Sequence, residues 1–301
     1  MNSTPEYLQT RPPKMLSKTV FWRIAEDIPK SLAWTLMVLS IAVPFLLWLI
    51  IANLGIVEPL FLPSPAQVGQ AIQTLWSTGE LPKDIIYSLF RVLAGFFMAA
   101  LFSIPLGILM GTFASVRALV EPIIGIVRYM PAPAFIPLLI LYFGLGEVPK
   151  VLLIFIGTFF FNTLMVADAV KFVPKDLIET TYTLGGKRLQ VLLQVITPYI
   201  LPNIIDAGRV NMAASWNLVI VSELVAATEG LGRRISVAQR FLKTDQIFAG
   251  LIVIGLIGLA IDLLFRLLLH LSCRWANKVG VGRWGDGGMG RWGIKVNRLL
   301  V

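Results

Sequence analysis

The chain has 301 residues, of which 56% are hydrophobic and only 14% are charged, a composition that no single soluble core could bury; we expect a polytopic membrane protein. One cysteine (Cys273) and one histidine (His270) exclude a disulfide framework and a multi-His or multi-Cys metal site within the chain. The net charge of +9 does not indicate nucleic-acid binding, because the basic residues flank apolar segments, where such charges usually set membrane topology.

Six apolar segments are each long enough to cross a bilayer, which requires about 20 residues. We expect spans at 32–52, 86–112, 120–145, 148–170, 199–227 and 247–272. Between the first two, segment 53–84 contains three prolines and then apolar residues at helical spacing, which predicts an outer-surface loop with a short interfacial helix. The chain therefore divides into an N-terminal tail (1–31), a first span with its outer segment (32–84), a core (85–272) and a basic, glycine-rich tail (273–301).

Two spans carry internal signals. Ser103, Gly107 and Gly111 lie four residues apart in the second span and predict a small-residue face that lets another helix approach closely. The third span is interrupted by prolines, among them Pro131 and Pro133, and irregular backbone at membrane depth is tolerated where protein buries it or where it lines an aqueous path.

Charged residues within the spans are candidates for function, because charge at membrane depth is costly. Arg91 and Arg266 lie near the ends of their spans, and we expect their side chains to snorkel to the interface. Arg128 precedes the proline-broken segment. Asp206 and Arg209 lie three residues apart in the polar fifth span, so an ion pair between them is the alternative to solute contact for Arg209.

The distribution of lysine and arginine predicts the orientation. Both tails, the 113–119 turn and the 171–198 stretch hold sixteen of the 26 basic residues, against six on the other side. This bias places both termini in the cytosol. The outer loop 228–246 is the exception, since it carries Arg233, Arg234, Arg240 and Lys243.

The polar stretch 174–198 lies between the fourth and fifth spans. Asp176 and Glu179 have the spacing of a capping box, which predicts a helix start, and Gly185-Gly186 predicts a break. Apolar residues then recur at helical spacing up to Pro198. We expect two short surface helices joined by a glycine elbow.

The same residues carry a resemblance. Glu179-Thr180-Thr181, Gly185, Val195 and Pro198 resemble the EAA-x3-G-x9-I-x-L-P loop of the permease subunits of bacterial ABC importers, with Thr-Thr for Ala-Ala, Val for Ile and Thr197 for Leu. Four other phrases resemble the branch that carries nitrate, bicarbonate, sulfonates and taurine: FLPSPAQV at 61–68, SLFRVLAGF at 88–96, IVRYMPAPAFIPLLILYFGLGE at 126–147 and SELVAATEGLGRRI at 222–235.

The resemblance implies an all-α, type I permease fold in the inner membrane with core domain 85–272. It also implies a homodimer with two ATPase subunits and a periplasmic or lipid-anchored solute-binding protein. ATP and Mg would be bound by the ATPases, so this chain would be no enzyme and would need no cofactor or metal of its own. Residues implied to couple to the ATPase lie in 174–198, hereafter the coupling stretch: Asp176, Glu179, Thr180, Thr181, Gly185 and Pro198. The alternative for this stretch is an ordinary cytosolic loop between membrane helices.

Two further sets are predicted from the residues. Candidates for the translocation path are Arg128, Pro131, Pro133, Arg209, Trp216 and Glu223, with a purely structural role as the alternative for Glu223. The basic residues Arg233, Arg234, Arg240 and Lys243, together with segment 53–84, are predicted to dock the binding protein and to favour anions, with an ordinary solvated loop as the alternative.

Three other classes compete with this interpretation. A stand-alone secondary transporter or channel would more naturally carry an inverted repeat and acidic coupling residues at the midplane, and neither is evident. A membrane-embedded enzyme lacks a nucleophile–base or metal constellation. The G-x-G-x-x-G match at 280–285 follows an apolar span rather than a strand, which argues against dinucleotide binding.

Overall fold

The computed structural model describes residues 28–273. The predicted tails 1–31 and 273–301 lie almost wholly outside this range, as does the G-x-G-x-x-G match. Within it the chain is helical and has no β-strand. The long apolar helices are α1 (Lys30–Asn53), α3 (Glu80–Thr112), α6 (Glu147–Val170), α9 (Thr197–Ala226) and α11 (Thr244–Ser272). The shorter helices are α2 (Pro65–Ser77), α4 (Ala114–Val127), η2 (Ala132–Phe135), α5 (Ile136–Phe143), α7 (Lys175–Thr183), α8 (Arg188–Gln190), η3 (Val191–Ile196) and α10 (Leu231–Arg240).

Five helical segments of the described chain are long and apolar enough to span a membrane, and there are six if the bent pair around residue 130 counts as one span. Five of the six predicted spans are matched by single long helices, and the third corresponds to this bent pair. The pair consists of Ala114–Val127 and Ala132–Phe143, which meet at 83°. The predicted break is therefore confirmed, since proline lacks the N–H that would continue a helix.

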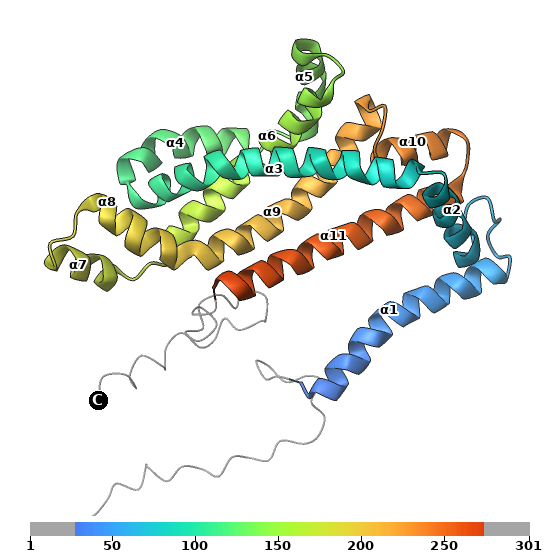
Figure 1. Cartoon of the computed structure of the whole chain (residues 1–301), viewed down its shortest axis with the longest axis horizontal. Coiled ribbons are helices and arrows are strands. Elements are labelled where there is room, and N and C mark those ends of the chain that lie inside the picture. The colour runs from blue at the N-terminus through green and yellow to red at the C-terminus, as the bar shows by residue number, and fades with distance from the viewer. Residues whose placement is uncertain (1–27, 274–301) are drawn as a thin grey trace, which may run out of the picture. The chain divides into compact units, whose positions relative to one another are not determined.

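The first span forms a unit of its own as far as Leu47, and a second compact unit begins at Trp48 and contains α2 to α11. Helix α1 has no buried residue and is apolar on all sides, as expected of a helix surrounded by lipid. In the compact unit, α3, α6, α9 and α11 pack on one another (Figure 1).

The closest packing joins α3 to α6 along the small-residue face that the sequence predicts. A Cβ atom built on Gly107 would lie 2.7 Å from the carbonyl oxygen of Thr163, and one on Gly111 would lie 2.6 Å from Cβ of Val170. Gly95 extends this seam toward the N-terminal ends of α3 and α6, because its Cβ would lie 2.6 Å from Cβ of Ile154. The prediction of a close helix approach is confirmed.

The predicted interfacial helix is α2. Its N-cap Ser64 accepts a hydrogen bond from the backbone N–H of Gln67, and the Gln67 side chain accepts one from the Ser64 N–H, a capping box. Val68 and Ala71 are buried against Ala249 of α11. Segment 53–84 is thereby fixed to the compact unit rather than separate from it.

Candidate functional site

The coupling stretch contains the helix, elbow and helix that the sequence predicts. Helix α7 ends at Thr183, and Gly185 follows with φ of +83°, a backbone conformation that residues with a Cβ rarely adopt. The predicted capping box is wrong, however. Pro174 occupies the N-cap position, so Asp176 lies in the first turn of α7, where its carboxylate faces the positive end of the helix dipole.

The sequence predicts that the second helix of the stretch ends at Pro198, but in the structure it continues past this residue. Helix α8, the π-helical turn η3 and α9 run on without interruption, so Arg188–Val225 counts as one candidate span. The hydroxyl of Thr197 donates to the carbonyl oxygen of Leu192, 2.8 Å away. A π turn changes the backbone register, which allows a helix to continue past prolines that lack an N–H.

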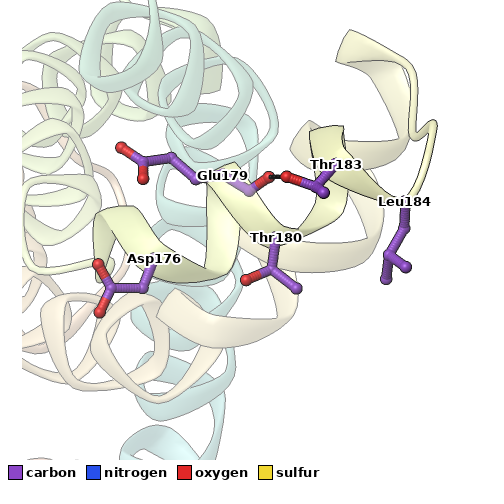
Figure 2. Close-up of a pocket in the computed structure, with 5 residues that line it drawn as sticks. All are labelled: Asp176, Glu179, Thr180, Thr183 and Leu184. Carbon is purple, nitrogen blue, oxygen red and sulfur yellow. Dashed lines mark hydrogen bonds between the residues drawn. The ribbon is translucent and has the colours of Figure 1, made fainter.

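The exposed surface of α7 forms a shallow hollow lined by Asp176, Glu179, Thr180, Thr183 and Leu184 (Figure 2). Figure 2 shows the Thr183 hydroxyl bonded back to the backbone of Glu179, and that donor lies 2.9 Å from the Glu179 carbonyl oxygen. No residue of α7 is buried.

The exposed residues of the stretch include large apolar ones. Leu184 is 82% exposed, and Leu177, Tyr182 and Leu189 are also exposed. Apolar side chains gathered on a polar, protruding element mark a surface that binds a partner. Ile178 points the other way and packs against a buried cluster formed by α3, α6 and α9. The stretch is thus held at its base and open at its tip.

The opposite ends of α3, α6 and α9 are tied together by a buried ion cluster. The Arg91 guanidinium is fully buried, and its atoms lie 2.6 Å from Glu223 and 2.5 Å from Glu147. Glu223 also accepts hydrogen bonds from the Ser88 hydroxyl and from the backbone N–H of Gly232. The expectation that Arg91 snorkels is wrong, because its guanidinium is buried and is neutralised by Glu223, which is also buried, and by Glu147, which is partly exposed.

The residues predicted to dock a binding protein fall into two groups. Arg234 is only 17% exposed, lies 2.6 Å from Asp84 and also pairs with Glu80. Its guanidinium is therefore neutralised by carboxylates of the same chain and is not a free cation on the surface. Arg233 is half-buried, and Arg240 and Lys243 are exposed. The Thr244 hydroxyl donates to Leu60, so this region does lie beside segment 53–84 as predicted.

The residues predicted to line a path are not brought to one place. Trp216 is buried in the main core and donates its indole N–H to the carbonyl oxygen of Ile254. Glu223 belongs to the ion cluster. Arg209 pairs with Asp206, as predicted, at 3.0 Å, and also with Asp262 at 3.4 Å. These contacts explain Trp216, Glu223 and Arg209 by packing and charge pairing.

Arg128, Pro131 and Pro133 share the bend between α4 and α5, where both prolines are exposed. The Arg128 guanidinium lies 4.8 Å from the centre of the Tyr129 ring and donates to its hydroxyl at 3.0 Å. Its Nε atom is shielded from solvent and has no hydrogen-bond partner. Among the described residues Arg128 has no carboxylate partner.

Local interactions do not balance the charge of Arg128. A guanidinium at membrane depth costs about 2.5–3.5 kcal/mol on insertion scales. The negative end of α4 returns about 0.3–1 kcal/mol, and a cation over an aromatic ring about 0.5–1 kcal/mol. The bend therefore holds a positive charge that the rest of the described chain leaves largely uncompensated.

Comparison with known proteins identifies the chain. Residues 103–275 match the family described as binding-protein-dependent transport system inner membrane component. The chain belongs to this family. It is a multi-pass membrane protein and the permease subunit of an ABC importer, so the interpretation as a stand-alone secondary transporter is set aside.

Individual relatives cover most of this permease. It is 35% identical to the taurine transport system permease protein TauC of Escherichia coli strain K12 over 271 residues, 88% of this chain and 97% of TauC. It is 32% identical to the putative aliphatic sulfonates transport permease protein SsuC of Bacillus subtilis strain 168, over 82% of this chain and 90% of SsuC.

Solved structures confirm the fold. An inward-facing structure of the MetNI methionine ABC transporter superposes with a TM-score of 0.58 at 19% identity, covering 64% of this permease and 95% of that chain. The all-α, type I importer permease fold expected from the resemblance is thereby confirmed.

The sequence did not indicate which residues pair with Arg91 and Arg234 in the ion cluster. Glu147 and Asp84 were not singled out, nor was the buried chain of polar contacts in which Asn162 donates to Ser103 at 2.6 Å and receives a bond from Asn211 at 3.1 Å. The available signal was charge balance, because buried charges in apolar helices must find opposite charges in other helices.

Proposed function

We propose that this permease carries small anions of the sulfonate class, delivered by a periplasmic or lipid-anchored solute-binding protein. The observation that carries the proposal is its similarity, over nearly its whole length, to permeases named for taurine and for aliphatic sulfonates. Nitrate and bicarbonate, which the sequence resemblance includes, are the other candidates and share with sulfonates a compact, negatively charged oxygen group.

The working assembly that we propose contains two copies of this chain and two ATPase subunits, which bind ATP and Mg. The chain itself holds no cofactor and catalyses no hydrolysis. The exposed apolar residues of the coupling stretch support this arrangement, since Leu177, Tyr182 and Leu184 offer a surface for another protein. Asp176, Glu179, Thr180, Thr181, Gly185 and Pro198 are the proposed coupling residues.

Transport would proceed by alternating access. Closure of the ATPases around ATP would displace α7, and Ile178 would pass that movement to the cluster shared by α3, α6 and α9. The bent pair α4 and α5 would then change its angle and open the path to the other side. The proposed path residues are those at the bend, Arg128, Pro131 and Pro133, with Arg209, Trp216 and Glu223 supporting the helices around it.

The orientation that we propose places both termini and the coupling stretch in the cytosol. Cysteines at Leu184 and Arg240, both exposed, test it in a chain whose Cys273 is replaced by serine. Leu184→Cys should react with a membrane-impermeant thiol reagent only in inverted vesicles, and Arg240→Cys only in intact cells. The reverse pattern would overturn the six-span topology.

Uptake measurements test the substrate class. The permease should be expressed with its ATPase and binding protein, and uptake of labelled taurine, ethanesulfonate, nitrate and bicarbonate should be compared, with a neutral amino acid as control. We expect ATP-dependent uptake of at least one sulfonate. Transport of the neutral solute alone would refute the anion assignment, and failure of an ATPase to co-purify would refute the assembly.

A further inference from the structure

The four arginines within the spans differ in how their charge is neutralised. Arg91 contacts Glu147 and Glu223, Arg209 contacts Asp206 and Asp262, and Arg266 lies 2.7 Å from Asp262. Arg128 has only the Tyr129 ring and hydroxyl and keeps one unsatisfied N–H. Of these four arginines it is the one for which the described residues supply no carboxylate.

The depth of Arg128 follows from the packing of the neighbouring turn. Ala132 lies against Gly157, since a Cβ built on that glycine would lie 3.1 Å from Cβ of Ala132. Gly157 is near the middle of α6, which crosses the membrane. Four residues span at most about 13 Å, so with α6 centred in the bilayer the backbone of Arg128 lies within the hydrocarbon layer, which is about 30 Å thick.

A second polar side chain is exposed at the same level. Leu218 would lie 2.3 Å from a Cβ on Gly157, which places α9 at the depth of the bend, and its neighbour Asn217 is exposed. The Asn217 amide donates to the carbonyl oxygen of Ala213 at 3.1 Å, within its own helix. Polar side chains at membrane depth face a water-filled cavity or another protein surface rather than lipid.

We infer that Arg128 is the residue that contacts the anion inside the membrane, in a water-containing passage bordered by Asn217. The inference rests on the proposed function and narrows it to one residue. A guanidinium presents paired N–H donors that match the oxygens of an oxyanion. Tyr129 holds the guanidinium loosely between transport cycles, and the solute's negative group completes the charge balance that the protein leaves open.

The test uses a cysteine in place of the arginine, so that charge can be removed and restored in one protein sample. Cys273 is the single cysteine of the chain, and Cys273→Ser therefore gives a cysteine-free parent. Ethanesulfonate uptake by the assembled transporter is measured in Arg128→Cys before and after treatment with a methanethiosulfonate reagent. The thiolate displaces sulfinate and forms a mixed disulfide that carries an aminoethyl group.

We expect Arg128→Cys to lose at least tenfold in uptake while basal ATP hydrolysis and assembly are retained. The cationic aminoethyl reagent should restore several-fold of the loss, and the neutral methyl reagent should not. Arg128→Lys, which keeps the charge without any reagent, should lose less than Arg128→Gln. Arg266→Cys, whose arginine faces outward beside Asp262, serves as the matched control and should keep near-parental uptake with either reagent.

Each outcome separates this inference from the proposed function. If the cysteine-free parent takes up no sulfonate, nitrate or bicarbonate, the proposed substrate class fails, and the inference with it. If the parent transports and both Arg128→Cys and Arg128→Gln transport as well as the parent, Arg128 does not contact the solute. Equal restoration by the neutral and cationic reagents, or equal loss in Arg128→Lys and Arg128→Gln, would show that the residue only fills space.

Discussion

The two ends of the compact unit are built on opposite principles. At the end that holds the N-termini of α3 and α6, Arg91 is fully buried and α3, α6 and α9 are joined by carboxylates within one chain. At the other end, α7 has no buried residue, and Leu184 leaves 82% of its surface open. The charges of the first region are neutralised within the chain as it folds. The apolar side chains of the second region remain exposed to water until a partner protein covers them.

The largest effect on folding is expected from Arg91→Met. Removing the guanidinium leaves the fully buried Glu223 carboxylate without its cation, and breaking a buried pair typically destabilises by about 3–5 kcal/mol. Thermal unfolding in detergent should show a clearly lower midpoint. Arg266→Met is the control, because its pair with Asp262 is exposed and worth at most about 1 kcal/mol. Equal losses in both variants would remove the distinction between the two ends.

Gly107→Ala tests the seam that connects the ends. The added methyl group would meet the Thr163 carbonyl oxygen at 2.7 Å, and such overpacking costs about 1–3 kcal/mol. Gly255→Ala adds the same methyl group where nothing lies within 4 Å, and should be neutral or stabilising by up to about 1 kcal/mol. A thermal unfolding comparison in which Gly107→Ala matches Gly255→Ala would contradict the close approach of α3 and α6.

Gly185→Ala should have a smaller and more local effect. Its φ of +83° disfavours a Cβ by about 1–2 kcal/mol, which changes the angle of the elbow rather than the core. Gly185→Ala should therefore clearly lower the rate of binding-protein-stimulated ATP hydrolysis and change the unfolding temperature only slightly. Gly185→Asn, which tolerates the left-handed region better, should retain more coupling than Gly185→Ala. The opposite order would mean that backbone geometry does not set the docking angle.

The smallest effect on folding is expected from Glu179→Lys. Glu179 is exposed, and substitutions at such positions usually change the free energy of unfolding by no more than about 0.5 kcal/mol. If this carboxylate faces an ATPase, transport should nevertheless be lost. The unfolding temperature and the uptake, measured on the same preparation, would show whether transport is lost while stability is unchanged. Normal uptake would refute the coupling role of the stretch.

Local patterns predicted most of the fold. Apolar runs gave the spans, prolines gave the bend at Pro131, and the spacing of Asp206 and Arg209 gave their ion pair. Long-range contacts were not predictable in this way. Arg91 and Glu223 are 132 residues apart, and no periodicity within either helix indicates which opposite charge lies across the interface.

Two errors in the coupling stretch have local causes. Asp176 and Glu179 match the capping-box spacing, but Pro174 already occupies the cap position, and the pattern alone does not give the register. Pro198 looks like a helix end because proline interrupts the α-helical hydrogen bonds. The π turn η3 absorbs that interruption, and such turns have no clear sequence signal.

The seam between α3 and α6 has a mechanical consequence. Because Gly95, Gly107 and Gly111 leave no room for even a methyl group, neither helix can slide or rotate against the other without collision. We expect the two helices to move as a single strut. Helix α6 has 24 residues and is about 36 Å long, with α7 following its C-terminal end and Arg91 paired with Glu147 at its N-terminal end. A displacement of a few ångströms at α7 would then be transmitted almost in full to the ion cluster around Arg91.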